Sequence, residues 1–309
     1  MLPNAHGTGR SQEANLAIRT TLLTCLSMLA FAGNSILCRL ALMERHIDPL
    51  SFTTLRLASG ALILYALVCF SSRRASATPV AQAATSARQS GSWLGAIALV
   101  LYALSFSLAY TNMESGVGAL ILFGSVQLSM LLYGMIKGER PTALSMVGLL
   151  ISITGLVLLL LPGSSAPPLG AAGLMAIAGA AWGWYSIRGK GAANPLASTA
   201  SNFARAVPFS LMALVPLLAT LHWDARGLTY AILSGTVTSG LGYVIWYGVM
   251  KQLTVLKAST VQLSVPILTA IMGTALLGEV LTLQLMVSCI LVLGGIGMVM
   301  VSKGRQQTH

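Results

Sequence analysis

Charged side chains are scarce in this chain. Asp, Glu, Lys and Arg make up 8% of its 309 residues, whereas an average soluble domain carries about 25%. Hydrophobic residues account for 55% of the sequence, and its mean hydropathy is +0.80. So few polar groups cannot cover the surface of a water-soluble fold. The composition therefore predicts a protein whose outer surface faces lipid.

Sequence patterns of catalytic and metal sites are missing as well. The chain has no H-E-x-x-H, G-x-S-x-G or G-x-x-x-x-G-K-[ST] sequence, so metalloprotease, hydrolase-elbow and ATP-binding chemistry have no support. Its four Cys show no C-x-x-C spacing, which argues against a zinc site or a redox pair. We expect no enzymatic activity, no cofactor and no bound metal, and an ATP-driven pump would need a partner chain.

Long apolar runs are what the sequence does contain. Several reach the roughly 18 to 20 residues that cross about 30 Å of hydrocarbon, and spans in lipid are helical because each backbone group must find an internal partner. Asp48-Pro49, Pro162-Gly163 and Asn194-Pro195 mark turns between them. We predict an all-α integral membrane protein with ten transmembrane helices, at 17–43, 50–70, 92–112, 114–136, 142–161, 169–188, 198–220, 227–249, 256–278 and 281–301.

Basic residues are distributed unevenly between these spans. With a cytoplasmic N-terminus, thirteen Lys and Arg fall on the cytoplasmic side and two, Arg45 and Arg226, on the other. This positive-inside bias predicts that both tails, 1–16 and 303–309, are cytoplasmic. The pI near 10.0 does not indicate nucleic-acid binding, because the charge is spread over short loops rather than gathered in one stripe. The expected partner of this charge is the lipid bilayer.

The two halves of the chain resemble each other. Ala119–Gln127 aligns with Ala258–Pro266, and Gly138-Glu139 aligns with Gly278-Glu279. Each half, 17–161 and 169–302, contains five predicted helices. Because five is odd, the second half must be inserted upside down relative to the first, as in many secondary transporters whose substrate site lies between the repeats.

These residues carry a family resemblance over roughly 20–302. The run Asp48–Arg56, Ala109-Tyr110-Thr111 and the two Gly-Glu turns resemble the EamA domain of the drug/metabolite transporter superfamily. The second copy matches through Trp182-Gly183, Ser264-Val265-Pro266 and Gly294-Gly295. The resemblance implies a ten-helix carrier of the inner (plasma) membrane, commonly an exporter of amino acids or other small metabolites. One departure is Gln127, where the family usually has proline.

Polar and aromatic residues at mid-span depth are the candidates for substrate contact. Amides buried in hydrocarbon need hydrogen-bond partners, so they are expected to face the bundle. Tyr110 and Tyr247 are instead expected either to anchor at the membrane interface, which Trp and Tyr favour, or simply to pack against neighbouring helices. The predicted substrate-binding residues are Asn34, Tyr102, Phe106, Gln127, Trp182, Tyr185, Tyr243 and Gln262.

Prolines and glutamates carry the remaining structural predictions. Pro208 and Pro266 fall within spans and are expected to kink their helices. Glu139 and Glu279 are expected to have structural roles, because a carboxylate at the start of the following helix can accept its free N–H groups.

The few ionisable groups bear on the cargo. All seven acids are predicted in loops or at helix ends, which leaves a buried carboxylate relay without support. Arg39, Arg56 and Arg205 are likewise assigned to helix ends, so a nucleotide sugar or polyphosphate would find no matching charge at mid-span.

The leading hypothesis is therefore a secondary transporter of neutral or zwitterionic metabolites, with an amino-acid exporter favoured, that works by alternating access around a midplane cavity. An importer or multidrug carrier of the same fold, and a non-transporting scaffold or receptor subunit, remain as alternatives. The direction, the coupling ion, the exact solute and the oligomeric state stay open.

Overall fold

Helices dominate the computed structural model, which describes residues 6–75, 90–138, 140–163, 165–189, 192, 194–250, 252–253 and 261–306. Ten helical segments lie in these ranges, and no strand does. They are α1 (His6–Met43), α2 (Pro49–Ala75), α4 (Trp93–Tyr110), α5 (Ser115–Ile136), α6 (Ala143–Leu160), α7 (Leu169–Gly189), α8 (Pro195–Leu214), the continuous α9–η2–α10 (Ala225–Leu233, Ser234–Leu241 and Gly242–Met250), α12 (Ser264–Leu277) and α13 (Leu283–Gln306). The predicted all-α class with ten helices is confirmed.

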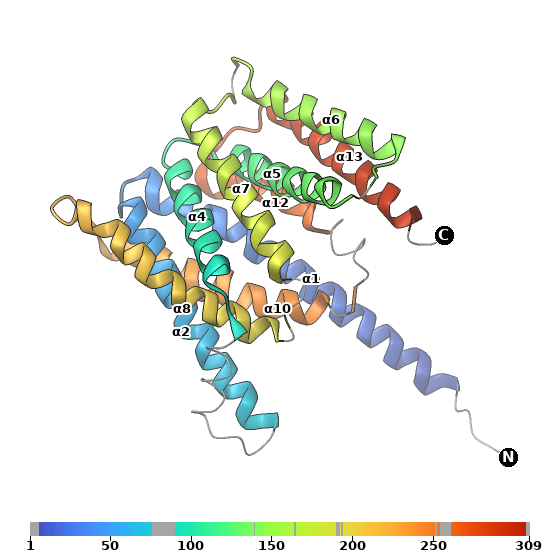
Figure 1. Ribbon diagram of the computed structural model, residues 1–309, viewed down its shortest axis with the longest axis horizontal. Coiled ribbons are helices and arrows are strands. Elements are labelled where there is room, and N and C mark those ends of the chain that lie inside the picture. Colours follow the sequence, from blue (N-terminus) through green and yellow to red (C-terminus); the bar gives the residue numbers. More distant parts are fainter. Residues whose placement is uncertain are drawn as a thin grey trace.

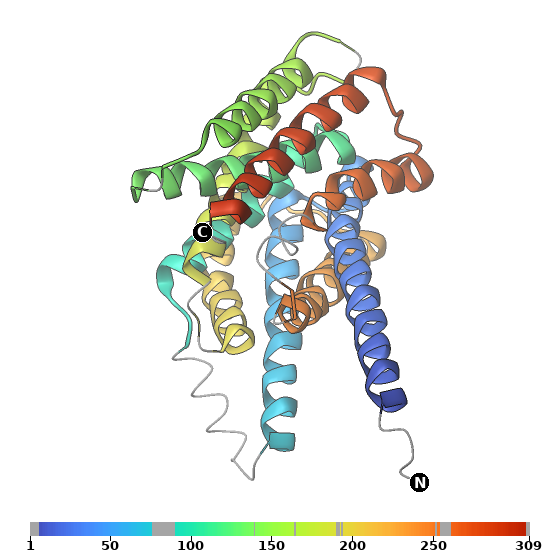
Figure 2. The ribbon, with the colours of Figure 1, turned by 90° about the vertical axis from the view of Figure 1, so that its right-hand side faces the viewer.

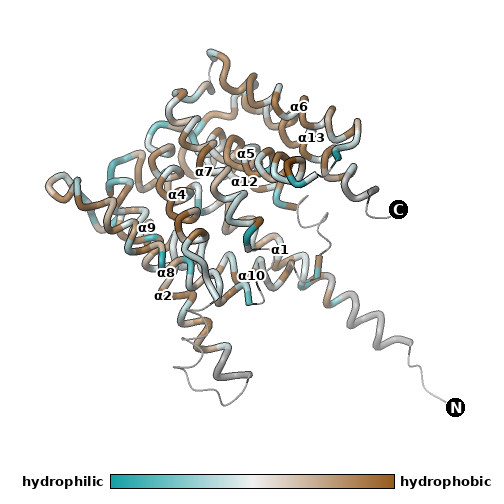
Figure 3. The backbone as a smooth tube through the Cα atoms, viewed as in Figure 1, coloured by the Kyte–Doolittle hydropathy of each residue, from teal (hydrophilic) through white to brown (hydrophobic). Residues whose placement is uncertain are grey.

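The outer surface of the bundle is apolar. Seven described helices are long and apolar enough to cross a membrane, and α12 is a shorter apolar helix. Large aliphatic side chains such as Leu62, Ile136 and Ile290 are more than 70% exposed. Hydrophobic residues dominate helices such as α5, α6 and α13 (Figure 3). Such a surface is stable in contact with lipid tails and unstable in water, so this is a multi-pass membrane protein.

Helix pairing relates the two halves by an approximate two-fold arrangement. α6 packs against α13, α2 against α8 and α5 against α12, so helices at equivalent places in the two halves meet each other. α7 contacts α4 and α5, just as α1 contacts α9–η2–α10 and α12. Figures 1 and 2 both show α6 and α13 as a side-by-side pair at one edge of the bundle. With five helices in each half, this pairing is what an inverted repeat predicts.

Small residues bring α6 and α13 close together. A Cβ at Gly148 would lie 2.5 Å from the carbonyl oxygen of Gly295, so only glycine fits there. The Ser152 hydroxyl donates to the Val292 carbonyl at 3.1 Å across the same interface. In lipid, close backbone approach and interhelical hydrogen bonds of this kind replace the hydrophobic effect as the source of helix association.

The two Gly-Glu turns share one geometry. Gly138 and Gly278 both have positive φ, 92° and 69°, and each ends a helix. Four residues later Thr142 and Thr282 accept hydrogen bonds from the backbone of the next helix, each at 3.1 Å. Threonine therefore caps the following helix. The prediction that Glu279 does so was wrong, and Glu139 lies outside the described residues.

The remaining differences from the predicted spans lie at two prolines and at a π-helical stretch. α8 runs through Pro208 and ends at Leu214, where a 3₁₀ turn containing Pro216 begins. Pro266 lies in the first turn of α12 rather than deep within a helix, and there its missing N–H would have no helical partner anyway. The eighth span contains a π-helical stretch, η2, between α9 and α10.

Candidate functional site

Trp182 of α7 is the centre of a group of stacked aromatic rings. Its ring centroid lies 5.4 Å from that of Tyr185 and 5.3 Å from that of Tyr243 on α10, and both pairs are stacked. On the other side Tyr102 of α4 lies 4.9 Å away at a tilt of 45°. Because α4 belongs to the first half of the chain and α7 and α10 to the second, this aromatic cluster joins the two repeats.

The aromatic cluster continues along α4 toward one end of the bundle. Phe106 lies 5.5 Å from Tyr102 and 4.7 Å from Tyr110, edge to face. Tyr110 is fully buried, and its hydroxyl donates to the Ser115 carbonyl at 3.2 Å. Tyr110 is therefore packed inside the bundle, which is one of the two roles predicted for it. The side chain of Tyr247 lies outside the described residues.

Asn34 of α1 anchors the π-helical segment η2. Its Oδ1 accepts hydrogen bonds from the hydroxyls of Ser234 at 2.8 Å and Thr238 at 3.3 Å. The amide oxygen is thus satisfied inside the bundle, as the cost of burying it requires. π-helical turns occur often at functional sites, and this one leads directly to Tyr243. Asn34 therefore belongs to the same region as the aromatic cluster.

The two predicted glutamines stand apart from that region. Gln127 is half-buried on α5, and Gln262 is half-buried just before α12. None of the ring contacts or hydrogen bonds described for the aromatic cluster involves either side chain. The structure thus brings together six of the eight predicted residues: Asn34, Tyr102, Phe106, Trp182, Tyr185 and Tyr243.

Arg56 is the main residue that the sequence analysis missed. It lies two turns into α2, about 10 Å along the helix axis, and is 2% exposed. Nη2 donates to the Tyr102 hydroxyl at 3.1 Å, and Nε donates to the Ser239 hydroxyl at 3.3 Å. Its guanidinium carbon is 5.1 Å from the Phe106 ring centroid and 5.3 Å from that of Tyr102. The bundle therefore does hold a fixed interior charge, contrary to the prediction.

Asn202 of α8 is a second missed residue. Its Oδ1 accepts the Ser92 backbone N–H at 2.9 Å, and its Nδ2 donates to the Tyr185 hydroxyl at 3.4 Å. It is buried. Asn202 therefore fixes one edge of the aromatic cluster against the start of α4.

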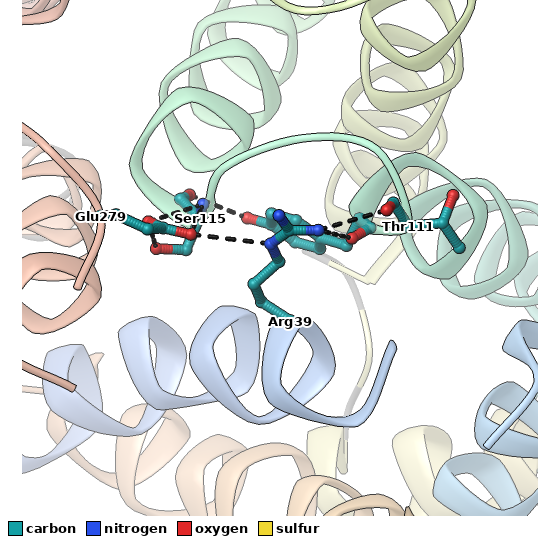
Figure 4. Close-up of polar contacts among 5 residues, drawn as sticks. Arg39, Thr111, Ser115 and Glu279 are labelled. Atoms are coloured by element: carbon teal, nitrogen blue, oxygen red, sulfur yellow. Dashed lines mark hydrogen bonds and ion pairs between the residues drawn. The ribbon is translucent and has the colours of Figure 1, made fainter. Parts of the chain in front are cut away.

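Arg39 and Glu279 form an ion pair toward the end of the bundle where α1 ends and α13 begins. Arg39 Nη1 donates to the carbonyls of Tyr110 at 2.9 Å and Thr111 at 3.2 Å, and its Nε lies 3.7 Å from a Glu279 oxygen. Glu279 in turn accepts the backbone N–H of Ser115, the first residue of α5, at 2.8 and 2.9 Å. Figure 4 shows Arg39 reaching between the Glu279 turn and the α4–α5 loop. Glu279 therefore caps a helix of the other repeat.

A second carboxylate next to this ion pair is perturbed. Burial, and then the negative charge of Glu279, raise the pKa of Glu114, while Arg39 lowers it by a smaller amount. Glu114 is the residue preceding α5, and its side chain makes no capping hydrogen bond there. The Glu114 carboxylate therefore does not stabilise the start of α5 through a capping hydrogen bond.

Comparison with known proteins agrees with this architecture. A model of the EamA-like transporter family matches residues 18–161 and again residues 169–301. An uncharacterized protein of Pseudomonas aeruginosa is 49% identical over 282 residues, which cover 91% of this chain and 94% of that protein. The chain belongs to the EamA-like transporter family. An uncharacterized transporter of Archaeoglobus fulgidus is 27% identical over 210 residues, 66% of this chain and 74% of that protein. A solved crystal structure with 16% identity and a TM-score of 0.64 covers 92% of this chain and 98% of its own, and it supports the fold.

Around Trp182, the interior of this EamA-like transporter offers aromatic rings, hydroxyls, the amides of Asn34 and Asn202 and the guanidinium of Arg56. Among the described residues, no group of three or more His, Cys, Asp or Glu side chains is placed to hold a metal ion. A few directed polar groups among aromatic surfaces are suited to orienting a small organic solute.

Proposed function

We propose that this protein is a secondary transporter of small zwitterionic metabolites, foremost amino acids, and that it exports them by alternating access. The solute binds against the aromatic cluster, with Asn34, Tyr102, Phe106, Trp182, Tyr185 and Tyr243 as contact residues. Gln127 and Gln262 take part in a conformation that brings α5 and α12 toward the cluster.

The contact between Trp182 and Tyr102 is the observation that supports this proposal most strongly. It joins the two inverted repeats in the interior of the bundle, where transporters of this construction bind their substrates. Movement of one repeat against the other changes the spacing of these rings, so solute binding and conformational change are physically coupled. The Arg39–Glu279 ion pair, which joins α1, α5 and the α12–α13 turn, holds helices of both repeats together at one end of the bundle.

We place the protein in the inner membrane with both termini in the cytoplasm. The support is the distribution of basic residues. Ser71 near the end of α2 and Asn112 just after α4 are both exposed. We expect single cysteines at these two positions, introduced into a protein without the four native cysteines, to be labelled from opposite sides of the membrane. Labelling of both from the same side would contradict this topology.

Flux measured on purified protein in liposomes tests the transport function. Vesicles are loaded with a mixture of labelled amino acids and related metabolites, and efflux is compared with that from protein-free vesicles. Repeating the measurement with pH and sodium gradients imposed and then abolished reports whether either ion drives transport. The cysteine labelling described above also reports which way the protein is inserted in the vesicles. Faster flux from the cytoplasmic to the outer side than in the reverse direction would identify an exporter, and the opposite result an importer.

The alternatives predict different results. A multidrug carrier would move chemically unrelated organic cations as well as metabolites. A scaffold or receptor subunit would give no solute flux above that of empty vesicles, and this result would contradict the proposal.

A further inference from the structure

Arg56 has one donor group that the fold leaves unused. Nε and Nη2 bond to Ser239 and Tyr102, but Nη1 is buried and has no hydrogen-bond partner. A buried donor without an acceptor destabilises the fold, and a charged donor does so more strongly. The rest of the guanidinium is held in a fixed direction, so Nη1 is presented in one orientation rather than being free to search for a partner.

The charge of Arg56 is not neutralised within the described part of the chain. The ion pairs there join Arg39 to Glu279, and His46 to Glu44 and Asp224. Around Arg56 stand the rings of Tyr102 and Phe106 and the hydroxyl of Ser239, which offset only part of the cost of burying a cation. The guanidinium of Arg56 is therefore a buried cation whose Nε and Nη2 are bonded and whose Nη1 has no acceptor among the described residues.

The position of Arg56 connects this open donor to the aromatic cluster. Its two hydrogen bonds reach Tyr102 of the first repeat and Ser239 of the second. Tyr102 also contacts Trp182, and Ser239 lies in the π-helical turn that precedes Tyr243. An anion at Nη1 would therefore lie beside the rings and touch both repeats.

We propose that Arg56 Nη1 binds the carboxylate of the transported solute. The inference rests on the proposed transport function and specifies its substrate class as carboxylate-bearing solutes. A carboxylate matches the geometry of a guanidinium edge and gains a charge-assisted hydrogen bond. A single cation suits one negative charge, whereas the doubly charged phosphate of a sugar phosphate would leave a second charge uncompensated. The solute's remaining part packs against the faces of the rings.

Binding to matched acid and amide probes tests the assignment. L-threonine, L-leucine and L-phenylalanine are each compared with their carboxamides by calorimetry on the full chain in lipid nanodiscs, which requires no transport. We expect at least one acid to bind about tenfold or more tightly than its amide, the effect of one charge-assisted hydrogen bond. Equal affinity for acid and amide in all three pairs overturns the proposal.

Substitutions assign the preference to Arg56. Arg56→Gln keeps a donor for Tyr102 but removes the charge, and it should abolish the preference for the acid. Arg56→Lys keeps the charge and should retain a reduced preference, which decides the question if the glutamine variant does not fold. The matched control is Arg205→Gln, because Arg205 also lies over an aromatic ring, Trp93 at 5.3 Å, that has no part in the aromatic cluster. An acid preference that survives in Arg56→Gln overturns the assignment.

The outcomes separate this inference from transport itself. Acid-selective binding without flux in liposomes would refute the transport function and leave the carboxylate site standing. Flux of solutes without any preference for acids would support the transport function and refute the carboxylate site.

Discussion

Two arginines lie inside the bundle, and their surroundings differ. Arg39 contacts a carboxylate and two backbone carbonyls, so its charge is balanced within the fold. Arg56 is more deeply buried and contacts two hydroxyls and two rings, with no carboxylate among the described residues. A buried ion pair is costly to break once formed, whereas a buried cation without its anion is stabilised by whichever anion arrives. The comparison separates a contact that holds helices together from one that receives a solute.

The difference follows from where each arginine lies. Arg39 lies where the ends of α1, α4, α5 and α12 meet, and there turns supply free carbonyls and the Glu279 carboxylate. Arg56 faces the middles of α4 and of the α9–η2–α10 span, where backbone groups are already bonded within their helices. Only side chains remain as partners there, and tyrosine and serine are neutral. We therefore expect Arg39 to govern stability and Arg56 to govern affinity.

Removing the partner of Arg39 should give the largest effect. Glu279→Ala leaves a mostly buried guanidinium without its carboxylate and the first turn of α5 without its acceptor. We expect a loss of roughly 3 kcal/mol in the free energy of unfolding, seen as a lower Tm and a lower yield of monodisperse protein in detergent. Solute affinity of the folded fraction should change little.

Glu44→Ala is the matched control for this substitution. Glu44 also pairs with a basic side chain, His46 at 2.9 Å, but it is exposed, and exposed pairs contribute little. Its Tm should stay close to that of the unmodified protein. If Glu279→Ala folded normally and lost solute affinity, Glu279 would belong with Arg56 rather than with Arg39.

Loss of the central ring should have an intermediate effect, on transport rather than on stability. Trp182 contacts Tyr102, Tyr185 and Tyr243, and each aromatic pair contributes about 0.5–1.5 kcal/mol beyond its buried area. If the solute uses this surface, Trp182→Ala should reduce flux in liposomes by about tenfold. The half-buried position of Trp182 makes the fold more tolerant of this change than a core tryptophan would.

Trp184→Ala provides the comparison on the same helix. Trp184 is 43% exposed and contacts Tyr133 and Arg188 away from the aromatic cluster. Flux should stay near that of the unmodified protein. Equal losses in the two variants would mean that the helix, rather than the ring at 182, is what transport requires.

Sequence reasoning predicted the architecture well and the interior charge poorly. Hydropathy, turn residues and the repeated Gly-Glu pair predict the ten helices, because lipid imposes span length and backbone bonding on any sequence. The choice of Trp182 and Tyr102 as interior candidates followed from their depth in the predicted spans, but their mutual contact did not. Arg56 was missed because an arginine close to a predicted boundary is ordinarily assumed to extend to the interface, yet an ionisable residue within a span is by default a functional candidate. Its partner Ser239 has no local signal, since only tertiary pairing of α2 with η2 brings the two together.

For Glu279 too, the sequence predicts the type of interaction but not its partner. Its repeated Gly-Glu setting predicts a helix cap, and a cap is what it forms, but on α5 of the opposite repeat. Thr142 and Thr282 cap the following helices, a role that the local sequence assigns to the glutamates. Local chemistry thus predicts the kind of interaction, whereas the partner depends on how the repeats interlock.

The smallest expected effect concerns Glu114, which stands beside the ion pair without belonging to it. Because the folded protein raises the pKa of this carboxyl, its charged form is disfavoured by folding. The resulting stability is present below the ordinary glutamate pKa of about 4.3 and is lost as pH rises through the higher pKa of the folded state. Glu114→Gln should therefore raise the Tm slightly at pH 8 and leave it unchanged near pH 4. The gain should shrink when Glu279 is also replaced by Gln, because the charge of Glu279 is the second cause of the raised pKa. Thermal unfolding of the four proteins at both pH values measures this coupling, and a Tm at pH 8 that falls in Glu114→Gln would show that the carboxylate supports the Arg39 contact instead of straining it.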